Sequence, residues 1–91
     1  MGIEELLEEI GIDNIGTYGK DGSYIIDIED DVEFGSIYST LEDSYLLDPI
    51  PENTLLTDHN ASIQYQYEDQ YLLNLIADFD EDSYKLTVKE I

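Results

Sequence analysis

The last third of the chain, residues 61–91, constrains the fold most strongly, because apolar and polar residues alternate there in three successive runs. Alternation is typical of strands that bury one face, since successive side chains point to opposite sides of a strand. Two short acidic segments, residues 68–69 and 80–83, separate the runs. The pattern predicts a three-stranded antiparallel meander.

Each run has one apolar face. The residues of that face are Ile63, Tyr65 and Tyr67 in the first run, Tyr71, Leu73, Leu75, Ala77 and Phe79 in the second, and Tyr84, Leu86 and Val88 in the third. Leu72 and Ile76 make the other face of the second run partly apolar, which is typical of a central strand. Lys85 and Lys89 lie on the polar face of the third run. Because lysines often protect an exposed strand edge, they favour an edge position for this strand.

Residues 2–12 have the periodicity of an amphipathic helix that ends at Gly11. The apolar side consists of Ile3, Leu6, Leu7 and Ile10, and the opposite side of Glu4, Glu5, Glu8 and Glu9. Glutamates four residues apart repel each other by roughly a few tenths of a kcal/mol per pair. Two interpretations remain open: an ordinary solvated helix face, or a face that offers charge to a partner.

An Asp-Gly pair at residues 21–22 predicts a hairpin across residues 15–28, because alternating apolar residues follow it. In the second half of this segment the apolar residues Tyr24, Ile26 and Ile28 occupy alternate positions. We expect this hairpin to join the C-terminal meander in one sheet.

Residues 29–47 have apolar side chains at helical spacing. These are Phe34, Ile37, Tyr38, Leu41 and Tyr45. Asp30 or Asp31 is expected to cap the N-terminus of this helix, where a carboxylate also meets the positive end of the helix dipole. Gly35 and the serines leave a strand in part of this stretch as an alternative.

Pro49 and Pro51 end this element, and residues 48–60 form a predicted loop with a short extended piece at residues 54–57. The predicted order of elements is therefore α-β-β-α-β-β-β. It indicates an α+β fold with an antiparallel sheet of about five strands, the N-terminal hairpin plus the C-terminal meander, and two helices packed on one face. No repeat or linker divides the chain, so we expect a single domain, residues 1–91, that buries about two thirds of its unfolded surface.

Charge is the most extreme property of the composition, because 23 acidic residues and only three lysines give a formal net charge of −20. Such a field repels nucleic acid and anionic membranes and attracts basic partners. The chain has no cysteine and no Gly-rich phosphate loop, so we expect no thiolate metal site and no cofactor. The chain begins without a signal-peptide pattern and contains no run long enough to span a membrane. We therefore expect a cytoplasmic protein.

Residues 78–82 begin like an EF-hand calcium loop, D-x-D-x-D. Ser83 stands where such a loop needs glycine and Lys89 where it needs glutamate, so no metal site is expected. His59, the single histidine, is predicted to be a hydrogen-bonding loop residue. No serine has a nucleophile-elbow context, and carboxylate pairs are too numerous to indicate acid/base catalysis. We therefore expect that the protein is not an enzyme.

The acidic residues are grouped along the chain. The groups are Glu4, Glu5, Glu8 and Glu9; Asp27, Glu29, Asp30, Asp31 and Glu33; Glu42 and Asp43; Glu68 and Asp69; and Asp78, Asp80, Glu81 and Asp82. Alternate strand residues lie roughly 6.6 Å apart, and helix neighbours at i,i+4 about 5–6 Å apart. Such rows approximate a nucleic-acid strand, which carries one phosphate charge about every 3.4 Å of axis. A basic groove that holds DNA would therefore accept this surface.

In its size, its excess of acid, its lack of cysteine and its compact α+β pattern, the chain resembles a class of small DNA-mimic inhibitors encoded by phages and mobile elements. Anti-CRISPR and anti-restriction proteins are the members of this class that it resembles in particular. The resemblance covers the whole chain and includes the acidic clusters DIEDDVE at 27–33 and DFDED at 78–82. It implies a protein that occupies the DNA-binding or PAM-reading site of a nuclease.

The leading hypothesis is an inhibitor that mimics nucleic acid in the basic cleft of a Cas nuclease or, as the next choice, a restriction nuclease. The expected contact residues are Asp27, Glu29, Asp30, Asp31, Glu33, Glu42, Asp43, Asp78, Asp80, Glu81 and Asp82. Glu42 and Asp43 are expected to extend the 27–33 cluster because they lie on adjacent elements, and 78–82 forms a second patch. One alternative is an immunity protein or antitoxin-like binder of a basic toxin nuclease, and another is an acidic domain adapted to high salt. The protein is expected to be a monomer or a homodimer.

Overall fold

The computed structural model describes residues 2–91 and has the predicted α+β fold. Its elements are α1 (Ile3–Ile10), β1 (Thr17–Tyr18), β2 (Tyr24–Ile28), α2 (Asp31–Asp43), β3 (Asp48–Pro49), the 3-10 helix η1 (Pro51–Asn53), β4 (Leu55–Leu56), β5 (Asn60–Tyr67), β6 (Tyr71–Asp78) and β7 (Ser83–Glu90). The predicted hairpin is confirmed as β1 and β2, and the predicted meander as β5, β6 and β7. None of the described helices is long and apolar enough to cross a membrane.

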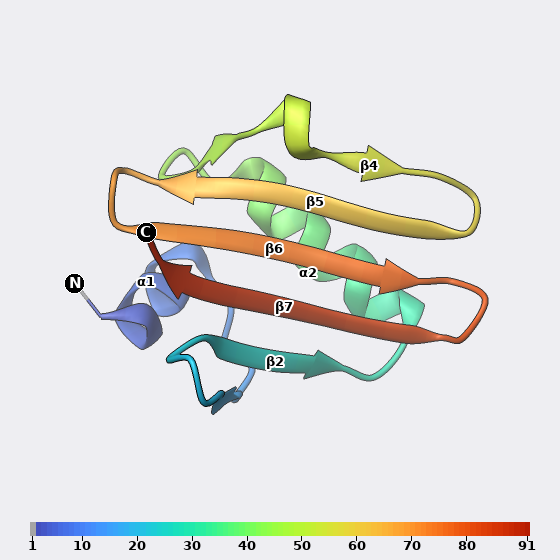
Figure 1. The fold of residues 1–91 in the computed structure, drawn as a ribbon, viewed down its shortest axis with the longest axis horizontal. Helices are drawn as coiled ribbons and strands as arrows, with labels where there is room; N and C mark the ends of the chain where they lie inside the picture. Colours follow the sequence, from blue (N-terminus) through green and yellow to red (C-terminus); the bar gives the residue numbers. More distant parts are fainter. Residues whose placement is uncertain (1) are drawn as a thin grey trace.

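The strands form one antiparallel sheet in the order β1-β2-β7-β6-β5-β3, and β4 also pairs with β5 (Figure 1). Strand β2 pairs with β7 along its whole length, from Tyr24 opposite Val88 to Ile28 opposite Tyr84. The predicted edge position of β7 is therefore wrong, because the hairpin covers the edge that the meander alone would expose. Strand β7 instead has a neighbouring strand on each side, and Lys85 lies between Asp27 on β2 and Ile76 on β6.

Both helices pack on the same face of the sheet, as predicted, and leave the other face uncovered (Figure 1). The helices contribute Ile3, Leu6, Leu7, Phe34, Ile37 and Leu41 to the buried core; the strands contribute Tyr24, Ile26, Ile28, Ala61, Ile63, Tyr65, Tyr67, Tyr71, Leu73, Leu75, Ala77, Tyr84, Leu86 and Val88. The alternating residues of β5, β6 and β7 therefore point into one apolar layer. Leu72 and Ile76, on the uncovered face, are partly buried among their strand neighbours, as expected for a central strand.

The helix ends agree with their local sequence. Gly11 ends α1 at a φ of 107°, a left-handed conformation that glycine adopts without a steric penalty. Helix α2 begins at the predicted cap Asp30, and the alternative of a strand in this stretch is wrong. The helix is shorter than the expected 29–47, because Ser44 is already extended, and Tyr45 is 94% exposed.

The segment between α2 and β5 is more regular than the predicted loop. Strand β3 pairs with the end of β5, and β4 pairs with its beginning, where Leu55 lies opposite Ser62. Strand β4 confirms the predicted extended piece at residues 54–57. The helix η1 separates the two short strands, so Pro51 sits in the first turn of a helix, where its missing N–H costs no hydrogen bond.

Candidate partner-binding surface

Two of the predicted acidic groups meet at one end of the sheet. Because Ile28 pairs with Tyr84 and Asp78 with Ser83, the junction between β2 and α2 lies beside the turn between β6 and β7. The turn before β5 reaches the same end of the sheet, since Asn60 pairs with Asp78. We call the carboxylates gathered here the acidic end: Glu29, Asp30, Asp31, Asp58, Asp78, Asp80, Glu81 and Asp82.

The hydroxyl of Tyr84 marks the point where the two groups approach each other. It donates a hydrogen bond to Oδ1 of Asp82, at 3.2 Å. Burial raises the pKa of Tyr84, and the negative charges of Asp82, Asp31 and Asp30 raise it further. One hydroxyl therefore lies in the field of carboxylates from both groups.

The N-terminus of α2 holds one side of the acidic end in place. Asp30 is the N-cap, and its Oδ1 accepts a hydrogen bond from the backbone N–H of Glu33 at 2.8 Å. The Glu33 side chain in turn accepts hydrogen bonds from the Asn14 side-chain amide and from the backbone N–H of Glu29. Glu33 is partly buried, so it supports the helix start instead of facing a partner.

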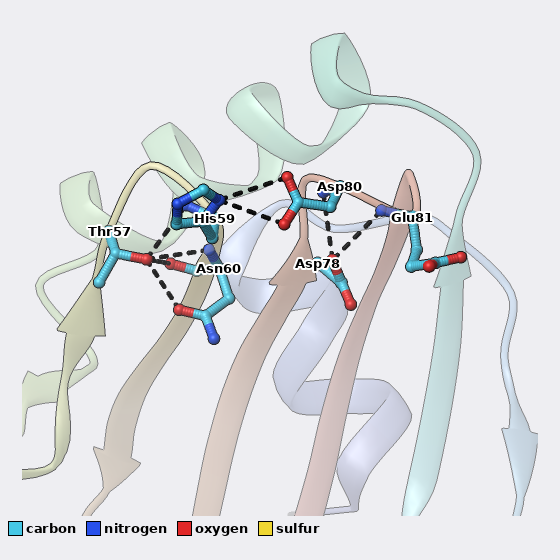
Figure 2. A network of polar contacts seen from close by, with 6 residues as sticks. All are labelled: Thr57, His59, Asn60, Asp78, Asp80 and Glu81. Atoms are coloured by element: carbon cyan, nitrogen blue, oxygen red, sulfur yellow. Dashed lines mark hydrogen bonds and ion pairs between the residues drawn. The ribbon is translucent and has the colours of Figure 1, made fainter.

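The turn between β6 and β7 holds the other side (Figure 2). Oδ1 of Asp78 accepts hydrogen bonds from the backbone N–H groups of Asp80, at 3.1 Å, and Glu81, at 3.2 Å. The two turns are joined by a backbone bond from Phe79 N–H to His59 O at 2.9 Å and by a contact of 3.2 Å between His59 Nδ1 and Asp80 Oδ2. His59 is thus a hydrogen-bonding loop residue, as predicted.

The acidic end contains carboxylates of two kinds. Four of them have partners within the chain: hydrogen bonds reach Asp30, Asp78 and Asp82, and Asp80 pairs with His59. Within residues 2–91, the side chains of the others, Glu29, Asp31, Asp58 and Glu81, make no hydrogen bond and no ion pair, and all of them are exposed. These side chains can therefore accept hydrogen bonds from a cationic partner without any loss of internal contacts.

Three other predicted contact residues are not part of the acidic end. Glu42 and Asp43 occupy the opposite end of α2, about 18 Å from Asp31 at 1.5 Å of rise per residue. The expectation that they extend the 27–33 cluster is therefore not met. Asp27 lies beside the acidic end, on the uncovered face of the sheet, where its cross-strand neighbour is Lys85.

Glu42 has a role inside the molecule. Its Oε2 accepts a hydrogen bond from the hydroxyl of Tyr65 at 2.8 Å, and its Oε1 lies 3.5 Å from the hydroxyl of Tyr38. Tyr65 is only 1% exposed, and burial raises its pKa far above the ordinary value, helped by the hydrogen bond to Glu42. Glu42 therefore supplies the partner that a buried tyrosine hydroxyl needs.

Asp58 and His59 were not recognised as members of a site from the sequence. They belong to a turn that the pairing of β5 with β6 brings to the acidic end, and no local pattern in residues 57–60 indicates that pairing.

The chemistry open to the acidic end is the recognition of cations. The end extends across strands β2, β7, β6 and β5, which is three inter-strand spacings, or about 14 Å. Within residues 2–91, no three His, Cys, Asp or Glu side chains are grouped closely enough to hold a metal ion. Carboxylates along such a front form charge-assisted hydrogen bonds with arginine and lysine.

Comparison of the chain with protein-family models, with curated proteins and with solved structures finds no match.

Proposed function

We propose that the protein is an inhibitor that mimics nucleic acid and blocks the DNA-binding or PAM-reading site of a bacterial defence nuclease. The observation that carries this proposal is the acidic end, where carboxylates from three separate turns lie side by side. Its four carboxylates without internal partners are available to the arginines and lysines that normally hold phosphates.

The charge density of the acidic end supports the comparison with DNA. Eight carboxylates lie at this end of the sheet, namely Glu29, Asp30, Asp31, Asp58, Asp78, Asp80, Glu81 and Asp82. Duplex DNA carries one charge for about each 1.7 Å of axis, which amounts to about eight charges over the width of about 14 Å. The protein therefore presents a similar number of negative charges over a similar width.

The ion-pair pattern supports the same proposal. Within residues 2–91, the single ion pair joins His59 to Asp80, and both side chains are largely exposed. Within the same residues no lysine forms an ion pair, so close lysine ion pairs do not offset the net charge of −20. A basic cleft supplies counterions, and it does so at a rate that falls as salt screens the attraction.

The test is binding of the purified protein to CRISPR and restriction nucleases at low salt, with excess duplex DNA as competitor. The informative variant combines Glu29→Gln, Asp31→Asn and Glu81→Gln, because none of these side chains makes an internal hydrogen bond or ion pair. The matched control combines Glu52→Gln, Asp69→Asn and Glu90→Gln. These side chains are also exposed and change the net charge by the same amount, but they lie outside the acidic end.

We expect DNA to displace the protein from the nuclease, and the acidic-end variant to bind at least about tenfold more weakly than the control. Equal losses in the two variants would mean that only total charge matters. A nuclease that stays bound in the presence of excess DNA would contradict the mimic and favour the immunity-protein alternative, in which the partner is held by a different surface.

A further inference from the structure

A cleft of about 710 Å³ opens beside α1, away from the acidic end. It is lined by Glu4, Leu7, Glu8 and Gly11 of α1, by the following residues Ile12, Asp13, Asn14 and Ile15, and by Tyr24 at the start of β2. Its volume lies within the range of sites that hold a small molecule or a single large side chain. None of its lining residues belongs to the acidic end.

The cleft combines apolar walls with a negative rim. Ile15 is 92% exposed, an unusual position for a large apolar side chain, and it lines the cleft together with Leu7 and Ile12, which are almost completely buried. Glu4 and Glu8 lie one helical turn apart on the same side of α1. A third carboxylate, Asp13, follows on the loop, so three acidic side chains line the same cleft as the exposed Ile15.

The one aromatic residue that lines the cleft, Tyr24, contacts the ring of a second tyrosine. Tyr18 packs edge-to-face on Tyr24, with ring centroids 4.9 Å apart, and remains 58% exposed. Loss of hydration raises the pKa of Tyr18, and the negative charge of Glu4 raises it further. An exposed tyrosine ring beside carboxylates is a favourable surface for a cation.

The walls of the cleft are held by contacts within the chain. Gly16 donates its N–H to the hydroxyl of Tyr24 at 2.8 Å, and a Cβ on Gly16 would lie 2.3 Å from the carbonyl oxygen of Ile25. The Asn14 side chain donates to Glu33 at the start of α2. The loop is therefore fixed against both the sheet and the second helix, and the cleft exists before any ligand arrives.

We propose that this cleft binds the arginine or lysine side chain of a partner polypeptide, in a segment where apolar residues flank the cation. The aliphatic stem of such a side chain would pack on the exposed Ile15 while its charged head reaches the carboxylates. Glu4, Glu8 and Asp13 would accept its hydrogen bonds. An anionic ligand is repelled by the rim, and a neutral apolar ligand leaves the carboxylates without partners. The proposal does not rest on the proposed function.

The test uses two synthetic peptides, N-acetyl-Leu-Arg-Leu-amide and the same peptide with citrulline in place of arginine. Citrulline keeps the shape of the side chain but lacks its charge. Each is titrated into ¹⁵N-labelled protein at 0.15 M NaCl, and backbone amide shifts are followed by NMR. We expect the arginine peptide to shift residues 4–15 and Tyr24, and to bind about tenfold more tightly than the citrulline peptide.

Two variants and a control distinguish binding of the peptide in the cleft from nonspecific attraction of a cationic peptide to the acidic protein. Glu4→Gln combined with Glu8→Gln should weaken the arginine peptide about tenfold, and Ile15→Ala should weaken it several-fold. The control, Glu52→Gln combined with Asp69→Asn, removes the same charge elsewhere and should leave binding unchanged. Equal affinity for both peptides, shifts spread over all acidic surfaces, or an equal loss in the control would each overturn the proposal. Circular dichroism confirms that each variant is folded.

Discussion

The hydrogen bond from Tyr65 to Glu42 makes stability depend on pH in the alkaline range. Tyr65 is buried, its hydroxyl lies 2.8 Å from a carboxylate oxygen, and its pKa is raised by burial first and by Glu42 second. The unfolded chain releases this proton near pH 10, the ordinary value for tyrosine, whereas the folded protein keeps it. Stability is therefore present below about pH 10 and is lost as pH rises above it, by about 1.4 kcal/mol per pH unit for this residue.

The substitution Tyr65→Phe removes both the hydrogen bond to Glu42 and the loss of stability above pH 10 that the Tyr65 hydroxyl causes. A hydrogen bond to a charged group contributes about 1.5–3 kcal/mol, and since Glu42 is exposed we expect a loss near the lower limit, about 1–2 kcal/mol at pH 7. Above pH 10 the free energy of unfolding of the wild type falls because of Tyr65, whereas that of the variant does not fall for this reason. The free energies of unfolding of the two proteins should therefore become equal roughly one pH unit above the pKa of free tyrosine, at about pH 11.

The assay is urea denaturation followed by circular dichroism at half-unit steps from pH 7 to 11.5. Tyr18, Tyr38 and Tyr84 also have raised pKa values, but they are present in both proteins, so the difference between the two curves isolates Tyr65. Tyr45→Phe is the control, because Tyr45 is 94% exposed. If wild type and Tyr65→Phe lose stability in parallel from pH 9.5 to 11.5, the buried hydrogen bond does not cause the alkaline loss.

Five further substitutions, at four positions, test the fold by urea denaturation at pH 7. Gly16→Ala should destabilise the protein by about 1–3 kcal/mol through the backbone clash, whereas Gly35→Ala, which has open space around it on α2, should stabilise it by about 0.5–1 kcal/mol; the same sign for both would refute the steric argument. Asp30→Ala should cost about 1 kcal/mol and Asp30→Asn almost nothing, because asparagine also caps helices, and an equal cost for both would show that charge matters more than the cap. Glu9→Lys should stabilise by about 0.5–1 kcal/mol, since it replaces repulsion from Glu5 with attraction and puts a cation in the last turn of α1; a gain that persists in 1 M NaCl would contradict this electrostatic origin.

Local patterns in the sequence were sufficient to predict the two helices, the hairpin and the meander. The alternation in residues 61–91, the Asp-Gly turn and the cap at Asp30 each act within a few neighbouring residues, and each feature is confirmed. The position of β7 was predicted wrongly from Lys85 and Lys89, because a lysine on an uncovered sheet face has the same spacing as a lysine on an edge strand. Only the pairing of β2 with β7, which is non-local, distinguishes the two cases.

The candidate surface also depends on non-local strand pairing, so local patterns in the sequence predicted it only in part. The clusters at 27–33 and 78–82 are visible in the sequence, but their meeting depends on the register that places Ile28 opposite Tyr84. Glu42 and Asp43 were expected to extend the first cluster because they lie on adjacent elements, but the length of α2 separates them from it. The exposed position of Ile15 in the cleft is also invisible in the sequence, since an apolar residue beside a predicted hairpin is normally interpreted as core.

The pairing of β2 with β7 also has a consequence for the order of folding. Strands β5, β6 and β7 are linked by short turns, whereas Tyr24 and Val88 are brought together across most of the chain. Closing such a long loop costs more entropy, so the meander should form first and the N-terminal hairpin should dock afterwards. The acidic end is then assembled only in this last step, and a partially folded chain, with the two clusters still apart, would not yet present the complete binding surface.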